Sequence, residues 1–290
     1  MSSDLMREAI ALYDRFTHEG LERRAFMADL TRLAGSAAAA SALLLSLSAC
    51  ATLPSPTGEA GLRTSEVEWE TAPGRRMRGY RAEPARSGPR RAAVIVIHEN
   101  RGLNEHIRDV ARRLGLAGYS ALAPDFLAPA GGTPADEDRA RTMIGALDLP
   151  ASVADSVATA NWLRSRSGGG HRRIGAVGFW WGGAMVNRLA VAAVEALDAG
   201  VSFYGPAPDP AEAARVRAAM LVLLAGRDDR VNATGLSWIR ALEAAGRGRG
   251  IVFPDVDHAF HNDTSAARYN RAAAERAWAA TLAFFAEHLR

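Results

Sequence analysis

The chain alternates apolar strands with helical patterns over most of its length, and this alternation limits the possible folds more than any other feature. Residues 92–97 form a continuous apolar run rich in β-branched side chains, as expected for a strand buried on both faces of a parallel sheet. Shorter or weaker runs follow at 120–123, 174–177, 201–204, 220–225 and 251–253. Helical patterns cover 105–116, 153–164, 183–197, 236–245 and 266–289. This order predicts an α/β fold with a mostly parallel central sheet flanked by helices.

Residues 64–290 are predicted to form a single domain. Two short strands, at 67–70 and 77–81, precede the alternating region and are joined by a Pro73-Gly74 turn. No internal repeat is evident, and the glycine triplet at 168–170 is too short to link two domains. The chain length of 290 residues agrees with one large domain preceded by a separate segment.

The composition excludes several classes of protein. A chain that is 48% hydrophobic and 23% charged is neither disordered nor collagen-like. A single cysteine excludes an internal disulfide framework and a cysteine-rich metal site. All 35 basic residues are arginine, the net charge is only +3, and the arginines are scattered along the chain. We therefore expect no nucleic-acid partner.

Residues 1–58 are predicted to be a leader segment. Arg23 and Arg24 lie in the sequence Glu-Arg-Arg-Ala-Phe-Met, and no charged residue occurs from 33 to 58, which resembles a twin-arginine export signal. The segment ends either in a small-residue cleavage site after Ala51 or in a lipoprotein-type box with a lipid on Cys50. The mature protein is then exported to the periplasm and touches the membrane only during export or through that lipid. The alternative is a buried alanine-rich helix.

The loops that follow the predicted strands hold the candidate functional groups. Gly178-x-Trp180-x-Gly182 lies between a buried strand and a helix, which is the frame of a nucleophile elbow. Asp228 and His258 follow later strands, in the chain order nucleophile, acid, histidine that this fold uses. His258 would take a proton from the nucleophile, and Asp228 would hold the imidazole in the correct tautomer.

Several of these assignments leave alternatives. Asp229 competes with Asp228, although the Gly-x-Asp spacing favours Asp228, and His261 is the second choice for the histidine. The backbone N–H groups of Trp181 and of the Glu99-Asn100 turn are the predicted oxyanion hole.

Four motifs taken together resemble the dienelactone hydrolases, a branch of the α/β-hydrolase fold, over about residues 66–290. They are Ile-His-Glu-Asn-Arg-Gly at 97–102, Gly-Phe-Trp-Trp-Gly-Gly at 178–183, Gly226-x-Asp228, and Asp-His-Ala-Phe-His-Asn at 257–262. The resemblance implies a cysteine nucleophile in the elbow, a triad completed by Asp228 and His258, and a role for Glu99 in activating the thiol. It also implies hydrolysis of a small-molecule ester or lactone without a metal or an organic cofactor.

The chain departs from the family at the central position of the elbow. Trp180 stands where the cysteine belongs, and an indole cannot form an acyl-enzyme. Two hypotheses follow. The first is an exported ester or lactone hydrolase whose activity, in the sequence as written, is lost or strongly impaired. The second is a catalytically silent ligand-binding or envelope-associated protein that keeps the fold.

A second departure concerns the substrate. Arg101, His261 and Asn262 are predicted to lie near it, but the family uses an arginine shortly after the catalytic histidine, where this chain has Asn262. Dienelactone itself is therefore not the expected substrate. A metal site built from His98, Glu99, His258, His261 and Asp263 is not expected either, because these residues lack a metal-ligand spacing. The sequence sets no oligomeric state.

Overall fold

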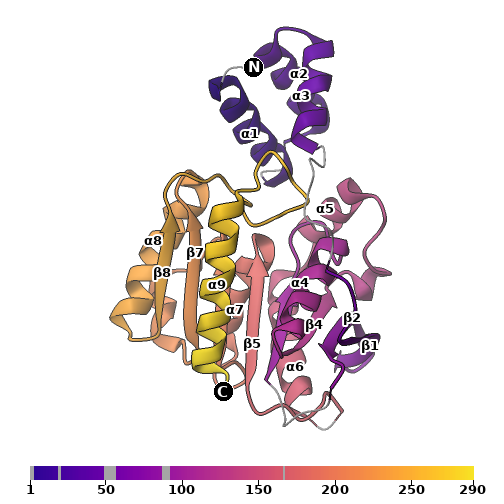
Figure 1. Cartoon of the computed structure of the whole chain (residues 1–290), viewed down its shortest axis with the longest axis vertical. Coiled ribbons are helices and arrows are strands. Elements are labelled where there is room, and N and C mark those ends of the chain that lie inside the picture. The colour runs from indigo at the N-terminus through magenta and orange to yellow at the C-terminus, as the bar shows by residue number, and fades with distance from the viewer. Residues whose placement is uncertain (1–2, 19–20, 49–56, 87–91, 166) are drawn as a thin grey trace.

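The computed structural model describes residues 3–18, 21–48, 57–86, 92–165 and 167–290. They form one eight-stranded sheet with helices on both faces and three helices above one end (Figure 1). The strands are β1 (Leu62–Ala72), β2 (Arg75–Pro84), β3 (Ala93–Ile97), β4 (Ser120–Asp125), β5 (Ile174–Phe179), β6 (Ala199–Phe203), β7 (Ala219–Ala225) and β8 (Gly248–Phe253). The sheet order is β1-β2-β4-β3-β5-β6-β7-β8. The pairs β1–β2 and β2–β4 are antiparallel, and all others are parallel.

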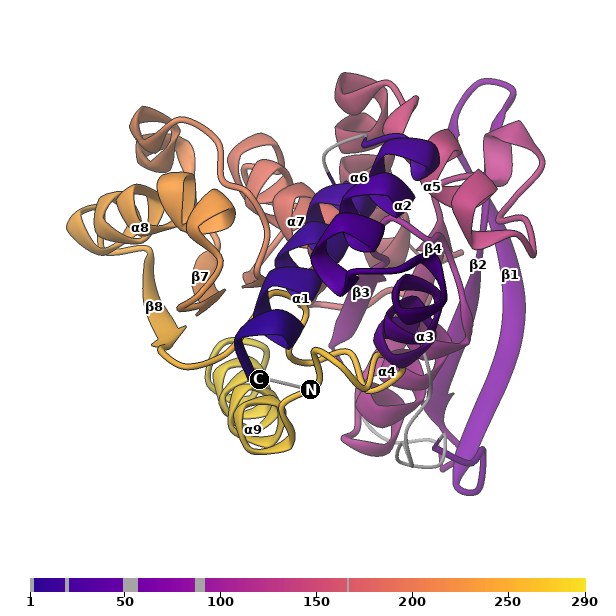
Figure 2. The same ribbon diagram turned by 90° about the horizontal axis from the view of Figure 1, so that it is seen from above.

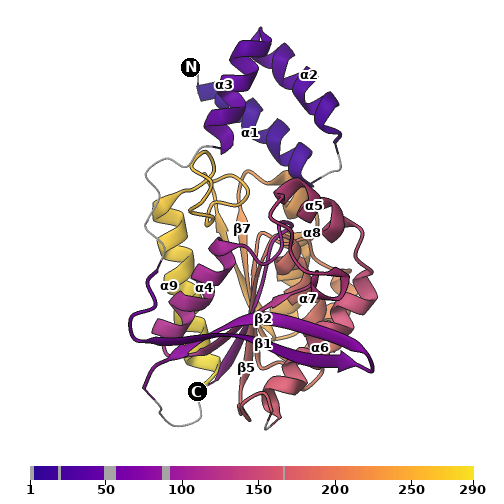
Figure 3. The same ribbon diagram turned by 90° about the vertical axis from the view of Figure 1, so that its right-hand side faces the viewer.

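The predicted mostly parallel α/β sheet is confirmed. Helices α4 (Glu105–Leu116), α5 (Glu137–Gly145), α6 (Leu149–Arg164), α7 (Trp181–Ala192) and α8 (Asp229–Ala244) lie between strands, and α9 (Arg271–His288) follows the last strand. Short 3-10 helices lie at Ala128–Ala130 and Pro210–Arg215. Helices α4 and α9 cover one face, and α6, α7 and α8 cover the other (Figure 3).

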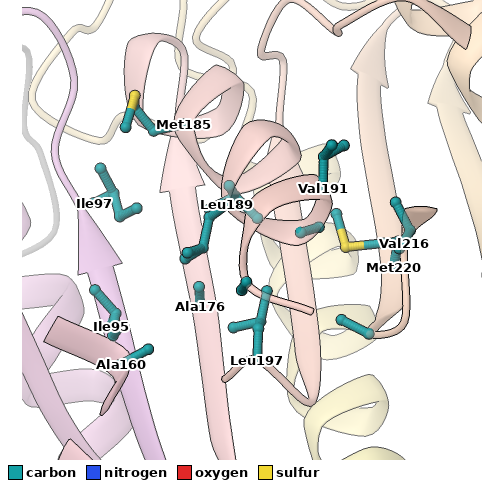
Figure 4. Close-up of a cluster of buried hydrophobic side chains, with 14 of the residues drawn as sticks. Ile95, Ile97, Ala160, Ala176, Met185, Leu189, Val191, Leu197, Val216 and Met220 are labelled. Atoms are coloured by element: carbon teal, nitrogen blue, oxygen red, sulfur yellow. The ribbon is translucent and has the colours of Figure 1, made fainter. Parts of the chain in front are cut away.

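The core has two layers because every side chain of β3 is buried and successive side chains point to opposite faces. Ile95 and Ile97 pack with Leu189 and Met185 of α7, and Figure 4 shows this layer. Val94 and Val96 join the layer under α4 and α9. Burying a side chain of this size stabilises the fold by about 1.5–3 kcal/mol, so the central strands form a rigid base for the loops at their carboxyl ends.

The N-terminal segment forms three helices, α1 (Ser3–His18), α2 (Arg23–Ala34) and α3 (Ala37–Ser48). They lie together above the carboxyl ends of the central strands (Figures 1 and 3). The arginine pair of the predicted export signal is at the start of α2. Cys50 and Ala51 lie outside the described residues. Among the helices of the described ranges, none combines the length and the apolar character needed to cross a membrane.

Candidate active site

The turn between β5 and α7 holds Trp180 in a conformation that side chains rarely adopt. Its φ is 49° and its ψ is −107°, which makes a bulky residue here a backbone outlier. The N–H of Trp180 donates to the carbonyl of Phe203 at 3.0 Å, and its carbonyl accepts from the N–H of Ala184 at 2.8 Å. The strained residue is therefore held between the end of β6 and the first turn of α7.

Two glycines permit this turn. A Cβ on Gly178 would lie 2.1 Å from the carbonyl oxygen of Gly182, and a Cβ on Gly182 would lie 2.2 Å from the carbonyl oxygen of Ile97. Both contacts are with backbone atoms, so no side-chain rearrangement could relieve them. Glycine is therefore required at both positions of the Gly-x-Trp-x-Gly pattern, because β5, α7 and β3 approach each other closely here.

The imidazole of His258 packs directly against Trp180. The two rings meet edge to face with their centroids 4.8 Å apart. His258 donates from Nδ1 to Oδ2 of Asp228, and both residues are buried. Burial alone would raise the pKa of Asp228, but the hydrogen bond and charge of His258, with help from Arg230, lower it below its usual value. The competing residue, Asp229, is exposed.

The indole of Trp180 is also covered by a cation. The guanidinium carbon of Arg230 lies 3.9 Å from the ring centroid, and its Nη2 lies 3.9 Å from Oδ1 of Asp228. Arg230 was not among the predicted site residues. Its position two residues after Asp228, in the first turn of α8, is the only sequence signal for it.

Glu99 is buried at the end of β3 and is held by two donors. The hydroxyl of Tyr204 donates to Oε1 at 3.3 Å, and Nδ2 of Asn262 donates to Oε2 at 3.4 Å. Tyr204 was missed in the sequence analysis because a tyrosine at the end of an apolar strand has the pattern of a core residue. Its ring lies edge to face with His258, with centroids 5.0 Å apart. Burial raises the pKa of Tyr204 well above its usual value, so it remains a donor.

The remaining predicted site residues are distributed around this centre. Trp181 opens α7, so its backbone N–H belongs to the first turn, and its ring stacks on His98 with centroids 5.4 Å apart. Asn100 donates from Nδ2 to the carbonyl of Thr17 at 2.7 Å. Arg101 forms an ion pair with Glu137, so its guanidinium points toward the start of α5.

His261 lies in the aromatic core. Its ring stacks on Phe179 with centroids 5.2 Å apart and also contacts Phe203 and Trp278. Burial lowers the pKa of His261 to about 3, so the imidazole is neutral at physiological pH. Among the described residues, no group of three or more histidine, cysteine, aspartate or glutamate side chains is arranged to hold a metal ion.

A buried charge network lies behind the site. Asp263 accepts from Nδ1 of His106 at 3.0 Å and pairs with Arg113, which also pairs with Asp109. Burial would raise the pKa of Asp263, but these hydrogen bonds and charges outweigh it and hold the pKa well below the usual range. The network connects the loop after His258 to α4.

We expect Asp263→Ala to lower the free energy of unfolding at pH 7 by about 3 kcal/mol, because it leaves the partly buried Arg113 guanidinium short of a carboxylate and the buried Nδ1 of His106 without its acceptor. A carboxylate with a depressed pKa stabilises the fold above its unfolded pKa of about 3.9, and this contribution is lost as pH falls through the folded pKa. The stability gap between the two proteins should therefore narrow below about pH 4. Urea unfolding over a pH series measures it. Glu66→Ala is the control, because it removes the exposed ion-pair partner of Arg108, which is on α4 like Arg113. It should lower the free energy of unfolding by less than about 1 kcal/mol.

The cavity beside Trp180 has a volume of about 640 Å³. Trp180, Trp181, Met185 and Arg188 form its floor, and residues of α1, α2 and α5 form its walls. A second hollow of about 690 Å³ reaches Asp228 and His258 from the other side of α1. A strained elbow, a histidine paired with aspartate and a cavity at the carboxyl ends of the strands together define an α/β-hydrolase.

Comparison with known proteins identifies the branch of that fold. The model of the dienelactone hydrolase family matches residues 77–289, and the chain belongs to this family. A relative in Escherichia coli (strain K12), provisionally named carboxymethylenebutenolidase, is 35% identical over 231 residues, which cover 74% of this chain and 84% of the relative. The crystal structure of a provisionally named dienelactone hydrolase from Klebsiella pneumoniae aligns with a TM-score of 0.67 at 29% identity, covering 78% of this chain and 100% of that one.

Proposed function

We propose that the chain keeps the acid–base pair and the ligand cavity of an ester or lactone hydrolase but lacks its nucleophile. The observation that carries this proposal is the contact between Trp180, in the strained elbow conformation, and the Asp228-paired His258. In the family's reaction a thiolate at this position would attack the carbonyl carbon of the substrate. The chain as written therefore binds an ester or lactone without forming an acyl-enzyme.

The neighbouring groups support the same assignment. A carbonyl oxygen above the elbow would face the first turn of α7, where the N–H of Trp181 lies at the positive end of the helix dipole. Glu99, held by Tyr204 and Asn262, would stand beside the thiol of a family member. Asn262 is neutral and directed at Glu99, so this position offers no cation for a substrate carboxylate. An uncharged ester or lactone fits it better than dienelactone.

The indole also opposes hydrolysis by water alone. The rings of Trp180 and Tyr204 both pack on the imidazole of His258. They therefore occupy the space that a water activated by the imidazole would need. We expect the chain and its His258→Ala variant to release nitrophenolate from p-nitrophenyl acetate at the same background rate. Absorbance spectroscopy measures both. A clear decrease in the variant would mean that the histidine activates water despite the indole, and would contradict the proposal.

We also propose that the N-terminal segment directs export to the periplasm. The support is the arginine pair at 23–24 followed by the uncharged stretch from 33 to 58. Mass spectrometry of protein recovered from the periplasm tests this and separates the two processing routes. Cleavage after Ala51 leaves a chain that begins at residue 52, whereas a chain that begins at Cys50 with added lipid mass indicates anchoring. A full-length chain found only in the cytoplasm would contradict export.

A further inference from the structure

The N-terminal helices close the cavity beside Trp180 from above. Phe16, Thr17 and Leu21 line it on this side, opposite Ile144 and Leu147 of the main domain. Viewed from above, α1 and α2 cross over the strands and α7 (Figure 2). The lining of the cavity as a whole is mainly apolar, but Glu22 and Arg23 also line the N-terminal side and Arg141 and Arg188 line the main domain's side.

Specific polar contacts hold these helices in place. The amide of Asn100 donates to the carbonyl of Thr17 at 2.7 Å, and Nη1 of Arg268 pairs with Asp14 at 2.9 Å. Asn100 and Arg268 are both buried. Nη1 of Arg141 donates to the carbonyl of Phe16 at 2.7 Å, and its guanidinium lies over the Phe16 ring. Buried polar groups need such partners, so undocking the helices would carry a substantial cost.

The three helices also have a hydrophobic core of their own. Phe16 and Phe26 stack with centroids 4.4 Å apart, and Leu30, Leu43 and Leu47 complete the cluster. This unit is additional to the family's domain. The Klebsiella pneumoniae protein is matched over 100% of its length by only 78% of this chain, and the family match begins at residue 77.

We propose that the N-terminal helices are the roof of the ligand cavity and select esters or lactones that carry an extended apolar group. With the carbonyl at the elbow, that group would extend between Ile144 and Leu147 on one side and Phe16 and Leu21 on the other. This inference rests on the proposed function of the site. Cleavage after Ala51 during export would remove the three N-terminal helices. The precursor and the processed chain would then differ in affinity for such ligands.

The test measures binding to the intact chain by tryptophan fluorescence, since Trp180 and Trp181 both line the cavity. The probes are γ-decalactone, which carries an alkyl chain, and γ-valerolactone, which carries only a methyl group. We expect γ-decalactone to bind at least about tenfold more tightly, because its added methylenes leave water. Leu21→Ala should weaken γ-decalactone binding about fivefold and leave γ-valerolactone binding unchanged. Leu21→Met, which keeps the side-chain volume, should retain the affinity.

Leu33→Ala is the matched control. Leu33, like Leu21, is a partly buried leucine of the three-helix cluster, but it does not line the cavity, so its replacement should leave both affinities unchanged. Equal losses in the two alanine variants would overturn the proposal, as would no loss in Leu21→Ala or no binding of γ-decalactone to the intact chain. These results are independent of hydrolysis by Trp180→Cys, which tests the proposed function, so failure of one can be told from failure of the other.

Discussion

Trp180→Cys is expected to hydrolyse p-nitrophenyl acetate at least about 10³-fold faster than the chain as written, since loss of the nucleophile costs about 10⁶-fold in a serine protease that has the same kind of triad on an unrelated fold. The substitution puts a thiol at the strained turn, where backbone bonds to Phe203 and Ala184 hold position 180. It also removes the indole from the face of His258. The imidazole, already paired with Asp228, could then accept the proton of the thiol.

Two variants control this gain. Adding His258→Ala to Trp180→Cys should return the rate to background, because the thiol then has no base. Trp181→Cys adds the same side chain one residue further along in the same cavity, but on the first turn of α7 rather than at the elbow, and should gain nothing. Equal gains in Trp180→Cys and Trp181→Cys would mean that any thiol in the cavity suffices, and the elbow would then have no special role.

Gly178→Ala is expected to destabilise the fold by about 3 kcal/mol or more. The added methyl group would lie 2.1 Å from the carbonyl oxygen of Gly182 and 2.3 Å from its carbonyl carbon. Relief requires α7 to move away from β5, and α7 packs in the main core layer through Leu189 and Met185. The midpoint of urea unfolding, together with an unchanged slope, measures the loss.

Gly145→Ala serves as the comparison. A Cβ there meets no atom within 4 Å, and the residue is in α5, where alanine is favoured over glycine by about 0.5–1 kcal/mol. We therefore expect unchanged or slightly increased stability. A Gly178→Ala protein as stable as Gly145→Ala would show that the turn between β5 and α7 is looser than the structure indicates.

The strands of the sheet could be predicted from the sequence where their side chains form an apolar run. The run at 92–97 corresponds to β3 because a strand buried on both faces is apolar throughout. The run at 251–253 predicted only the end of β8, which begins at Gly248, since Gly248 and Gly250 have no side chain to indicate a strand. The segment at 128–138 is rich in proline and glycine, a composition that favours a loop over regular structure. In the structure it contains a 3-10 turn, Thr133 is hydrogen-bonded to Asp125, and α5 begins at Glu137.

Those site residues that lie in loops directly after strands could be predicted from the sequence. Spacing favoured Asp228 over Asp229, and Asp228 is the residue that contacts His258. The placement of Tyr204, Arg230 and the N-terminal helices had no comparable local signal. Asn100 and Thr17 are 83 residues apart, and their hydrogen bond depends on how the N-terminal helices dock on the main domain. Contacts of this kind follow from tertiary packing and leave no periodic pattern in the sequence.

Peptide mapping of the Trp180→Cys protein by mass spectrometry, after brief exposure to p-nitrophenyl acetate, determines whether position 180 is the place of the nucleophile. We expect an acetyl group on the peptide that contains position 180, and no such group when His258→Ala is added. Cys50, the single native cysteine, provides an internal reference for nonspecific acetylation. Acetylation confined to the Cys50 peptide, or equal at the two positions with and without His258, would contradict the assignment of Trp180 to the nucleophile's place.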